Sequence, residues 1–300
     1  MNKITALLII NPNSRMGAEA DITEGIELLK SAGFELIQKE TKSAQDTGAV
    51  IDKFHQEIDM VIMGGGDGSI NSAADAVYRH QLTLAILPLG TANDLARSLG
   101  LPKDLIEVFK IIAANKSRRI DLGSFNGHYF FNASNIGLGT RVTHELTPDL
   151  KKRWGVFSYL RAAFLAFKKT RAFRVKIIVD GVPHRIKTIQ LAIGNGRFYG
   201  GGNIIDENAT IDDGLLKCYS LPPQSLWELL RVAPWLRAGK HRQLKRTFTA
   251  VGRRIEIITH RPREIYADGE AVGETPTVFE IIPKAINVIH IEPAGPSTAT

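Results

Sequence analysis

The sequence predicts a two-domain protein, with an α/β domain first and a β-sandwich domain second. Its length of 300 residues exceeds one average domain. Strand and helix signals alternate over the first part of the chain, which predicts a parallel sheet flanked by helices. From about Ser117, strand signals and hairpin turns follow one another instead. We therefore expect an α/β domain over residues 1–120, a β-rich domain over 121–284, and a disordered tail over 294–300.

Short β-branched or apolar runs predict the strands of the first domain. These runs are Ile4–Ile10, Phe34–Lys39, Asp59–Met63 and Thr83–Leu87. The segments between them have helical length and period. Polar residues follow all four runs, and ligands of parallel sheets collect at the carboxyl ends of the strands. The pattern therefore favours one shared binding site over four unrelated loops.

Nine further strand-like runs predict the second domain. They are Arg118–Phe125, Tyr129–Asn135, Phe173–Asp180, Arg185–Gly194, Leu215–Ser220, Thr247–Ala250, Arg254–Thr259, Glu264–Ala267 and Val278–Ile282. Asn126-Gly127 and Asp180-Gly181 are typical of hairpin turns. Helical insertions are expected at 153–169 and 222–240. The final run Ile286–Ile291 fits either sheet, so residues 285–293 are open to joining the first domain.

Composition limits the class of protein. Hydrophobic residues make up 44% of the chain, as in a folded globular protein. The longest apolar stretches, such as Ala6–Ile10, are far short of the roughly 20 residues of a membrane-spanning helix. The start of the chain shows no signal-peptide cleavage pattern. Cys218 is the single cysteine, which excludes an intrachain disulfide and a Cys-rich zinc site, and we expect it to be a small buried residue in a cytoplasmic protein.

A glycine-rich turn follows the third predicted strand. Residues 64–70 read Gly-Gly-Gly-Asp-Gly-Ser-Ile. Glycines let backbone N–H groups approach an anion closely, and a helix that starts near Ser69 adds its positive end. Because the carboxylate of Asp67 repels phosphate unless a cation stands between them, the turn indicates phosphate together with Mg²⁺. The alternative is a tight turn without a ligand.

Three motifs together resemble one enzyme family. They are Gly64–Ser69, Gly90-Thr91-Ala92-Asn93-Asp94-Leu95-Ala96, and Asp212–Leu216 preceded by Gly200–Gly202. In this combination the chain is similar to the diacylglycerol kinase catalytic family and, within it, to the bacterial YegS-like lipid kinases. The resemblance runs from Asn11-Pro12 to Asp268-Gly269-Glu270. It implies a nucleotide-binding first domain of the NAD-kinase and diacylglycerol-kinase type, and a second domain for lipid and metal.

The resemblance also implies an ATP site built from the strand-end turns. Carried onto this chain, the nucleotide contacts are Asn11, Pro12, Asn13, Ser14, Thr41, Gly64, Gly65, Gly66, Asp67, Gly68, Ser69, Ile70 and Thr91. Asn93 and Asp94, expected one turn into the next helix, are candidates for contact with phosphate, metal or substrate. Their alternative role is helix capping. We interpret Asp67 as an organiser of Mg²⁺ and phosphate rather than as a catalytic base.

The resemblance also implies residues for metal binding and for proton transfer. Family members hold a structural Mg²⁺ with one carboxylate and two carbonyls, which here are Asp213 and the carbonyls of Thr210 and Leu215. The alternative is a plain Asp-Gly turn, and the preceding segment 203–209 departs from the family because a proline is usual there. Glu270 matches the glutamate that accepts the proton of the attacking lipid hydroxyl. The alternative is an ordinary hairpin tip.

Two basic segments suggest a membrane surface. Residues 151–179 hold nine Lys or Arg and no acid, and 231–246 form a second basic stretch. Aromatic and aliphatic residues interleave with these charges, as in proteins that lie on anionic bilayers. They are Trp154, Phe157, Tyr159, Phe164, Phe167, Phe173, Trp227, Leu230, Trp235 and Leu236. The alternative is that these residues pack in the core. We do not expect nucleic-acid binding, because no recognised module accompanies the charge.

The expected function is an ATP- and Mg²⁺-dependent kinase that phosphorylates a hydroxyl of a membrane lipid, with Glu270 as the base. Diacylglycerol-like lipids, phosphatidylglycerol and sphingoid lipids are all compatible acceptors. One alternative is a kinase for a soluble acceptor such as NAD. Another is a nucleotide-binding membrane regulator without catalysis. We expect a cytoplasmic protein, peripheral at the inner face of the membrane, and leave a homodimer open.

Overall fold

The computed structural model describes residues 3–12, 14, 21–41, 43–140, 165–238, 240, 246–268 and 270–291. The chain divides into two compact units. Unit 1 extends to Ile120 and takes up the chain again from Lys284, and unit 2 comprises Asp121–Pro283. The expectations for residues 141–164, for 292–300, and for Asn13 and Gly269 lie outside the described residues.

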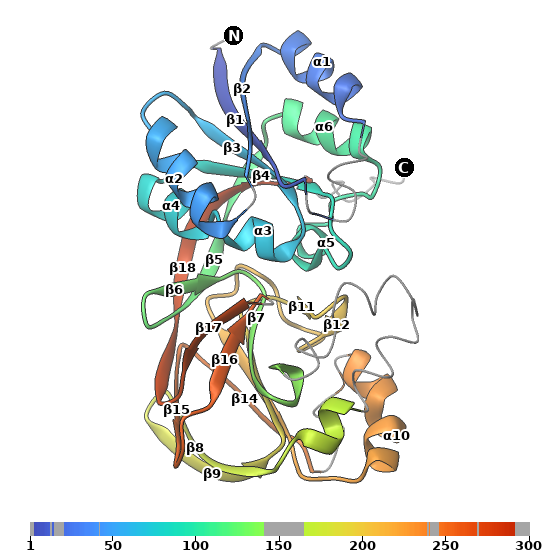
Figure 1. Cartoon of the computed structure of the whole chain (residues 1–300), viewed down its shortest axis with the longest axis vertical. Coiled ribbons are helices and arrows are strands. Elements are labelled where there is room, and N and C mark those ends of the chain that lie inside the picture. The colour runs from blue at the N-terminus through green and yellow to red at the C-terminus, as the bar shows by residue number, and fades with distance from the viewer. Residues whose placement is uncertain are drawn as a thin grey trace, which may run out of the picture. The chain divides into compact units, whose positions relative to one another are not determined.

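Unit 1 is an α/β fold with a parallel sheet (Figure 1). Its strands are β1 (Ile4–Ile10), β2 (Phe34–Glu40), β3 (Met60–Gly65) and β4 (Thr83–Pro88). Its helices are α1 (Thr23–Ser31), α2 (Ala44–Phe54), α3 (Asp67–Asn71), α4 (Ala74–His80), α5 (Asp94–Ser98) and α6 (Leu105–Ala113). Figure 1 shows α1 beside α6, and α2 beside α4, as their contacts require. β3 is buried along its whole length, as expected for a strand covered on both faces.

The order of the strands positions the binding edge. The sheet runs β2-β1-β3-β4, and the end of β18 (Thr277–Ile289) joins β4 in parallel. The chain moves from β1 to β2 in one direction and then crosses to β3 on the other side of β1. The gap between the loops after β1 and β3 is therefore a topological switch point, the place where open α/β sheets bind their ligands.

Unit 2 is an antiparallel β-sandwich, as the sequence predicts. One sheet runs β18-β15-β8-β9, and the other runs β14-β13-β10-β7-β16-β17. Its further elements are β5 (Ser117–Phe125), β6 (His128–Phe130), β7 (Ala133–Gly137), β8 (Phe173–Val179), β9 (Val182–Thr188), β10 (Gln190–Gly194), β11 (Phe198–Tyr199), β12 (Asn203–Ile204), β13 (Leu216–Leu221), α10 (Leu226–Arg237), β14 (Phe248–Gly252), β15 (Arg254–Thr259), β16 (Glu264–Ala267) and β17 (Glu270–Glu274).

The inner faces of both sheets supply the core of unit 2. Phe173, Val175, Ile177 and Val179 of β8 are buried in it, and the residues between them point outward. Leu191 and Ile193 of β10 reach the same core from the opposite sheet. This period-two burial is the reason these segments form strands. Cys218 is buried here, as expected, and its burial raises its pKa to about 12.

Some predicted strands differ from the observed ones. The run Arg185–Gly194 is two strands in different sheets, because the Thr188 hydroxyl bonds both the N–H and the carbonyl of Gln190 and turns the chain between them. The run Tyr129–Asn135 is likewise divided between β6 and β7. At the other end of the chain, the runs 278–282 and 286–291 are one long strand, β18, which pairs with β15 first and with β4 afterwards.

Candidate functional site

The loops after β1 and β3 are joined at the switch point of unit 1. Asn11 donates from its side-chain Nδ2 to the Ser69 hydroxyl at 2.7 Å, and from its backbone N–H to the Gly64 carbonyl at 3.0 Å. The Ser14 hydroxyl donates in turn to the Asn11 carbonyl at 2.8 Å. Two of the predicted nucleotide turns therefore form one connected surface at the carboxyl edge of the sheet.

Glycines allow the turns after β3 and β4 to lie backbone against backbone. A Cβ added to Gly90 would stand 2.4 Å from the Gly66 Cα, and one added to Gly65 would stand 2.5 Å from the Ser69 Cβ. The φ of Gly66 is −91°, so close approach and not a left-handed conformation is what requires glycine here. Glycine at these positions lets the two turns pack closely without side chains between them, as a backbone cradle for an anion requires.

The helix after the glycine turn begins earlier than expected. We predicted a start near Ser69, but α3 begins at Asp67 because the Ile70 N–H donates to the Gly66 carbonyl at 3.0 Å and closes the first turn. Gly68 and Ser69 therefore lie within α3, and Ile70 is buried beneath it. The helix α3 has only five residues. The close-packed turns therefore define this site, rather than the positive end of the helix.

Asp67 connects the glycine turn with the turn after β4. Its Oδ1 accepts hydrogen bonds from the backbone N–H groups of Asp94, at 2.7 Å, and Leu95, at 3.2 Å. Burial raises the pKa of the Asp67 carboxyl, while the hydrogen bonds from these amides act in the opposite direction. The carboxylate thereby fixes the start of α5 against the glycine turn.

Asn93 and Asp94 lie at the very start of α5, not one turn into it. Asn93 caps the helix in a left-handed conformation with φ of 51°. Its side chain is used within its own turn: Oδ1 accepts from the Gly90 N–H at 2.9 Å, and Nδ2 donates to the Pro88 and Gly90 carbonyls at 3.1 Å. Asp94 is the first residue of α5 and is buried, whereas Thr91 is exposed in the turn.

Thr41 reaches the same edge from β2. The register places Ile10 of β1 level with Glu40 and with Gly64, so the residues that follow these strands stand side by side. Thr41 is buried, and its hydroxyl lies 3.1 Å from that of Thr47. The predicted nucleotide residues that the structure describes thus follow the carboxyl ends of β1, β2, β3 and β4, with Thr41 and Ile70 buried, and their contact with a nucleotide stays a prediction.

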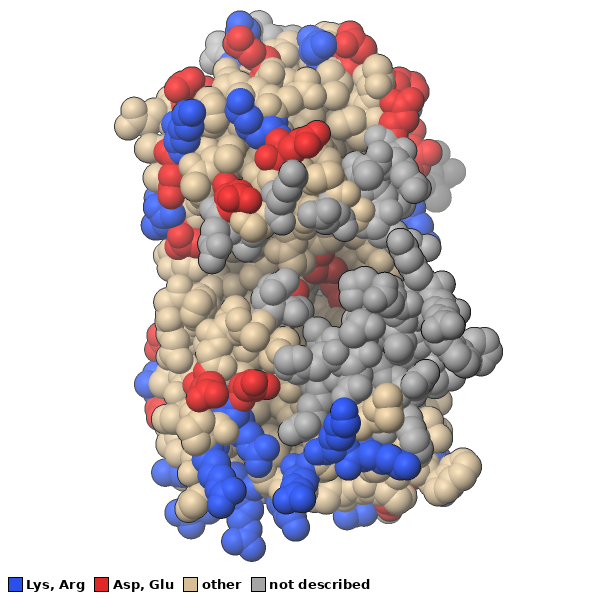
Figure 2. Space-filling model, viewed as in Figure 1, with Lys and Arg blue, Asp and Glu red and all other residues tan. Residues whose placement is uncertain are grey.

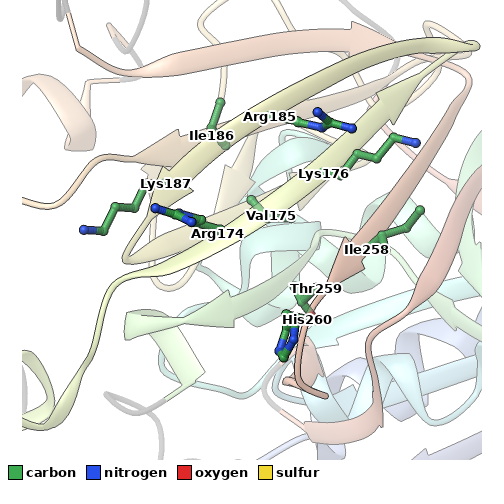
Figure 3. Close-up of a pocket in the computed structure, with 9 residues that line it drawn as sticks. All are labelled: Arg174, Val175, Lys176, Arg185, Ile186, Lys187, Ile258, Thr259 and His260. Carbon is green, nitrogen blue, oxygen red and sulfur yellow. The ribbon is translucent and has the colours of Figure 1, made fainter.

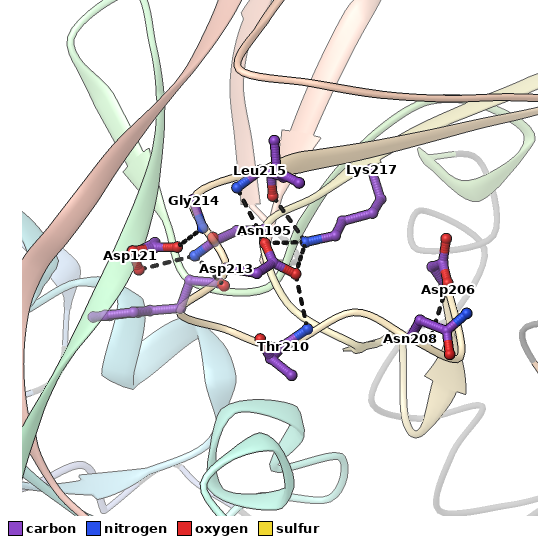
Figure 4. Close-up of polar contacts among 10 residues, drawn as sticks. Asp121, Asn195, Asp206, Asn208, Thr210, Asp213, Gly214, Leu215 and Lys217 are labelled. Carbon is purple, nitrogen blue, oxygen red and sulfur yellow. Dashed lines mark hydrogen bonds and ion pairs between the residues drawn. The ribbon is translucent and has the colours of Figure 1, made fainter.

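In unit 2, the predicted metal residues surround a lysine. The Lys217 ammonium donates to both carboxylate oxygens of Asp213 and, at 3.0 Å, to the Leu215 carbonyl (Figure 4). Among the described residues, no group of three or more His, Cys, Asp or Glu side chains gathers at one point. Since Lys217 already occupies the Asp213 carboxylate and the Leu215 carbonyl, two of the three ligands expected for Mg²⁺, this set does not fit a metal ion.

Asp268 and Glu270 flank the tip of the β16–β17 hairpin. The Asp268 carboxylate accepts backbone hydrogen bonds from Phe131 at 2.9 Å and from Asn132 and Ala133 at 3.3 Å. It therefore anchors the segment between β6 and β7. The backbone of Glu270 pairs with Ala267 as the first residue of β17. The predicted hairpin is thus confirmed, and the role of Glu270 as proton acceptor stays a prediction.

Sequence reasoning assigned no role to four residues that build this part of unit 2. Asp121 is buried and accepts from the Gly214 N–H at 2.6 Å, and Asn195 donates to the carbonyls of Asp121 and Phe131. Lys217 and Asp268 are the other two. For Lys217 the signal in the sequence is a charged residue inside a mostly apolar strand, Leu216–Leu221.

The basic aromatic segments are described only in part. Phe173 is buried in the sandwich core and Phe167 packs against a smaller core cluster, so for these two the core alternative holds. On α10, by contrast, Trp227, Leu230 and Trp235 are exposed. The side chain of Leu236 and residues 154–164 lie outside the described residues. Within the described part of the chain, no helix is long and apolar enough to cross a bilayer.

Comparison with known proteins accounts for both units. Residues 5–125 match the diacylglycerol kinase catalytic domain, and residues 134–290 match the YegS C-terminal NAD kinase beta sandwich-like domain. A probable lipid kinase YegS-like of Pseudomonas aeruginosa is 30% identical over 98% of this chain and 96% of its own. The diacylglycerol kinase of Bacillus subtilis is 27% identical over 95% of each chain. A crystal structure of a putative diacylglycerol kinase from Bacillus anthracis superposes with a TM-score of 0.80 at 25% identity, covering 97% of each chain.

Proposed function

The chain belongs to the YegS-like lipid kinases of the diacylglycerol kinase family, and on this premise we propose that it transfers the γ-phosphate of ATP to a hydroxyl of a membrane lipid. The observation that carries the proposal is the carboxyl edge of the unit 1 sheet. There the Asn11–Ser69 hydrogen bond and the Gly66–Gly90 approach join three turns at the switch point.

We assign the ATP phosphates to this edge. The turn after β3 carries three consecutive glycines, Gly64 to Gly66, which leave no Cβ between its backbone and a bound anion. The Ser69 hydroxyl is held in place by Asn11, and Thr91 is exposed in the turn after β4. Mg²⁺ accompanies ATP in phosphoryl transfer and neutralises charge on the phosphates. In this proposal Asp67 is a positioning residue, because its carboxylate already orders the start of α5.

Glu270 is our candidate for the general base. A lipid hydroxyl must lose its proton as it attacks the γ-phosphorus, and a carboxylate within hydrogen-bond reach accepts that proton. Its backbone pairs with Ala267 at the start of β17, and Asp268, two residues before it, accepts hydrogen bonds from three backbone N–H groups. The backbone of this hairpin is thereby anchored, which suits a step that depends on alignment.

A lipid acceptor requires the enzyme to meet a membrane surface, and α10 suits this contact. Leu229 faces the core of unit 2, whereas Trp227 and Leu230 point outward and are 80% and 48% exposed. Arg231 and Trp235 are exposed on the same side of the helix. Tryptophan and leucine beside arginine are typical of helices that lie in the headgroup region of an anionic bilayer.

A basic sheet face supports the same contact. Arg174 of β8 lies directly opposite Lys187 of β9, and Lys176 lies opposite Arg185. These four cations line a hollow of about 510 Å³ together with Ile258 and His260, with no acidic residue in the lining (Figure 3). Figure 2 shows Lys and Arg side chains gathered over unit 2 at the lower edge of the view. Like charges directly opposite one another on a sheet are unfavourable, which an anionic partner would relieve.

Incubation with labelled ATP and a bacterial lipid extract tests the function. We expect label in the organic phase, and mass spectrometry of the labelled lipid identifies the acceptor. Turnover with NAD in the absence of vesicles would instead support the soluble-acceptor alternative. Measurable ATP affinity without transfer to any lipid of a broad panel would support the non-catalytic regulator, and would overturn the proposal.

A further inference from the structure

Lys217 is a buried cation in the second sheet of unit 2. It lies on β13, a strand whose six residues are all buried, and it is only 5% exposed. A buried ammonium ion is costly unless its charge is paired and all of its N–H groups are hydrogen-bonded. Lys217 meets both conditions, because its three N–H groups have the two oxygens of Asp213 and the Leu215 carbonyl as acceptors (Figure 4).

The carboxylate of Asp213 is equally occupied. Besides Lys217, its Oδ2 accepts from the Thr210 N–H at 3.0 Å and its Oδ1 accepts from the Leu215 N–H at 3.1 Å. The intervening Gly214, with φ of +71°, donates to the Asp121 carboxylate at 2.6 Å and so fixes the middle of the loop. Residues 210–217 thus form a loop held together by an ion pair between a buried lysine and a more exposed aspartate.

This arrangement competes directly with a divalent ion. Two of the three expected Mg²⁺ ligands, the Asp213 carboxylate and the Leu215 carbonyl, are the acceptors of the Lys217 ammonium. Mg²⁺ binds oxygen at about 2.0–2.1 Å and requires near-octahedral geometry. An ion at these oxygens would lie against the ammonium group and be repelled by it. The two cations therefore exclude each other.

We propose that the Lys217 ammonium takes the place of the structural metal ion, so that the 210–217 loop is stable without a divalent cation. In this view Asp213 is a structural counter-ion in this protein. The proposal is independent of catalysis, because it concerns only the folding of unit 2. The Mg²⁺ that accompanies ATP is a separate ion and is unaffected by it.

Thermal unfolding of the full chain without nucleotide or lipid tests the proposal. We expect wild type to unfold at the same temperature in excess EDTA and in excess MgCl₂. Lys217→Gln removes the ammonium and leaves Asp213 without a counter-charge, so this variant is expected to unfold several degrees lower in EDTA. It should recover part of that loss in MgCl₂, because an ion that binds only the folded state raises its stability. Lys187→Gln, at an exposed lysine on β9, should show neither effect.

Two further measurements make the outcome unambiguous. The double variant Asp213→Asn/Lys217→Gln should lose the response to MgCl₂, which distinguishes this site from any other Mg²⁺ site. If Lys217→Gln does not fold, Mn²⁺ binding to the nucleotide-free wild type, followed by electron paramagnetic resonance, still decides the matter. A clear rise in the unfolding temperature of wild type with MgCl₂ that Asp213→Asn abolishes would overturn the proposal. Loss of kinase activity alone would have no bearing on it.

Discussion

The Oδ1 atom of Asp67 accepts a 2.7 Å hydrogen bond from the backbone N–H of Asp94. This bond joins the glycine turn after β3 to the first residue of α5, two segments 27 residues apart in the chain. The sequence places a carboxylate in a turn that we predict to bind phosphate, where its charge is unfavourable unless a cation is present. The structure adds a second reason for it, because the carboxylate orders the neighbouring turn.

Replacement of Asp67 should change how stability depends on pH. Burial raises the folded-state pKa of Asp67 above its ordinary value of 3.8. Its protonated form therefore contributes stability that is fully present below the unfolded pKa and is lost as the pH rises through the folded pKa. Asp67→Asn has no such proton but keeps an oxygen that accepts from Asp94. We expect the stability of wild type relative to Asp67→Asn to fall as the pH rises above 3.8.

Urea unfolding of both proteins over a series of pH values measures this difference, and the titrations of all other carboxyl groups cancel in it. A difference that grows in favour of wild type as the pH rises would contradict the raised pKa.

Gly90→Ala should destabilise unit 1. The new Cβ would stand 2.4 Å from the Gly66 Cα and 2.7 Å from the Asn93 Oδ1, so the two turns must separate. Overpacking of this kind costs about 2 kcal/mol. We expect a loss of this size in the free energy of unfolding, measured with urea. We also expect a higher KM for ATP, because the turns after β3 and β4 are separated in the variant.

Gly48→Ala is the matched control for that substitution. Gly48 lies in the interior of α2, and nothing stands within 4 Å of an added Cβ. Alanine is favoured over glycine in a helix by about 1 kcal/mol, so this variant should be slightly more stable than wild type. Equal losses in the two variants would show that the contact between the turns is not the cause.

Trp227→Ser should weaken membrane association. Trp227 is 80% exposed on α10, and loss of one large apolar side chain from a lipid interface lowers the affinity on the order of tenfold. Sedimentation with vesicles that contain phosphatidylglycerol measures the bound fraction. Val251→Ser, a 37% exposed residue on β14, serves as the control and should bind like wild type.

Varying the salt concentration separates the contribution of the basic face of β8 and β9 from that of α10. Binding of wild type should fall as ionic strength rises, because exposed charges are screened, and should be weak on vesicles of phosphatidylcholine alone. If Trp227→Ser and Val251→Ser bind vesicles equally well and binding does not change with salt, the membrane contact lies on another part of the protein.

The parts of unit 1 that depend on local pattern could be predicted from sequence. The predicted run Ile4–Ile10 is β1. The predicted runs Phe34–Lys39 and Thr83–Leu87 agree with β2 and β4 to within one residue at each end. β1 and β4 are central strands, where continuous apolar runs leave one interpretation, whereas β2 lies at the edge of the sheet. The start of α3 was misplaced because glycines at 66 and 68 disfavour a helix, whereas the packing of Gly66 against Gly90 determines the outcome.

The arrangement around Asp213 could not be predicted, because it depends on which way one side chain points. Lys217 in isolation suggests an exposed position on an edge strand, yet β13 lies between β10 and β14 and is buried on both faces. Asp121 contacts the same loop across 93 residues of sequence. Pairings of this kind are set by the tertiary structure and leave no periodic signal.

The central claim is tested most directly by measuring the transfer of labelled phosphate from ATP to lipid. The measurement compares Glu270→Gln with Glu274→Gln, a variant on the same strand. Both variants make the same change on β17, but only Glu270 is assigned the role of general base. We predict that Glu274→Gln labels lipid as wild type does, and that Glu270→Gln loses on the order of a hundredfold or more in rate. Full activity of Glu270→Gln, or labelling of no lipid by wild type, would contradict the account.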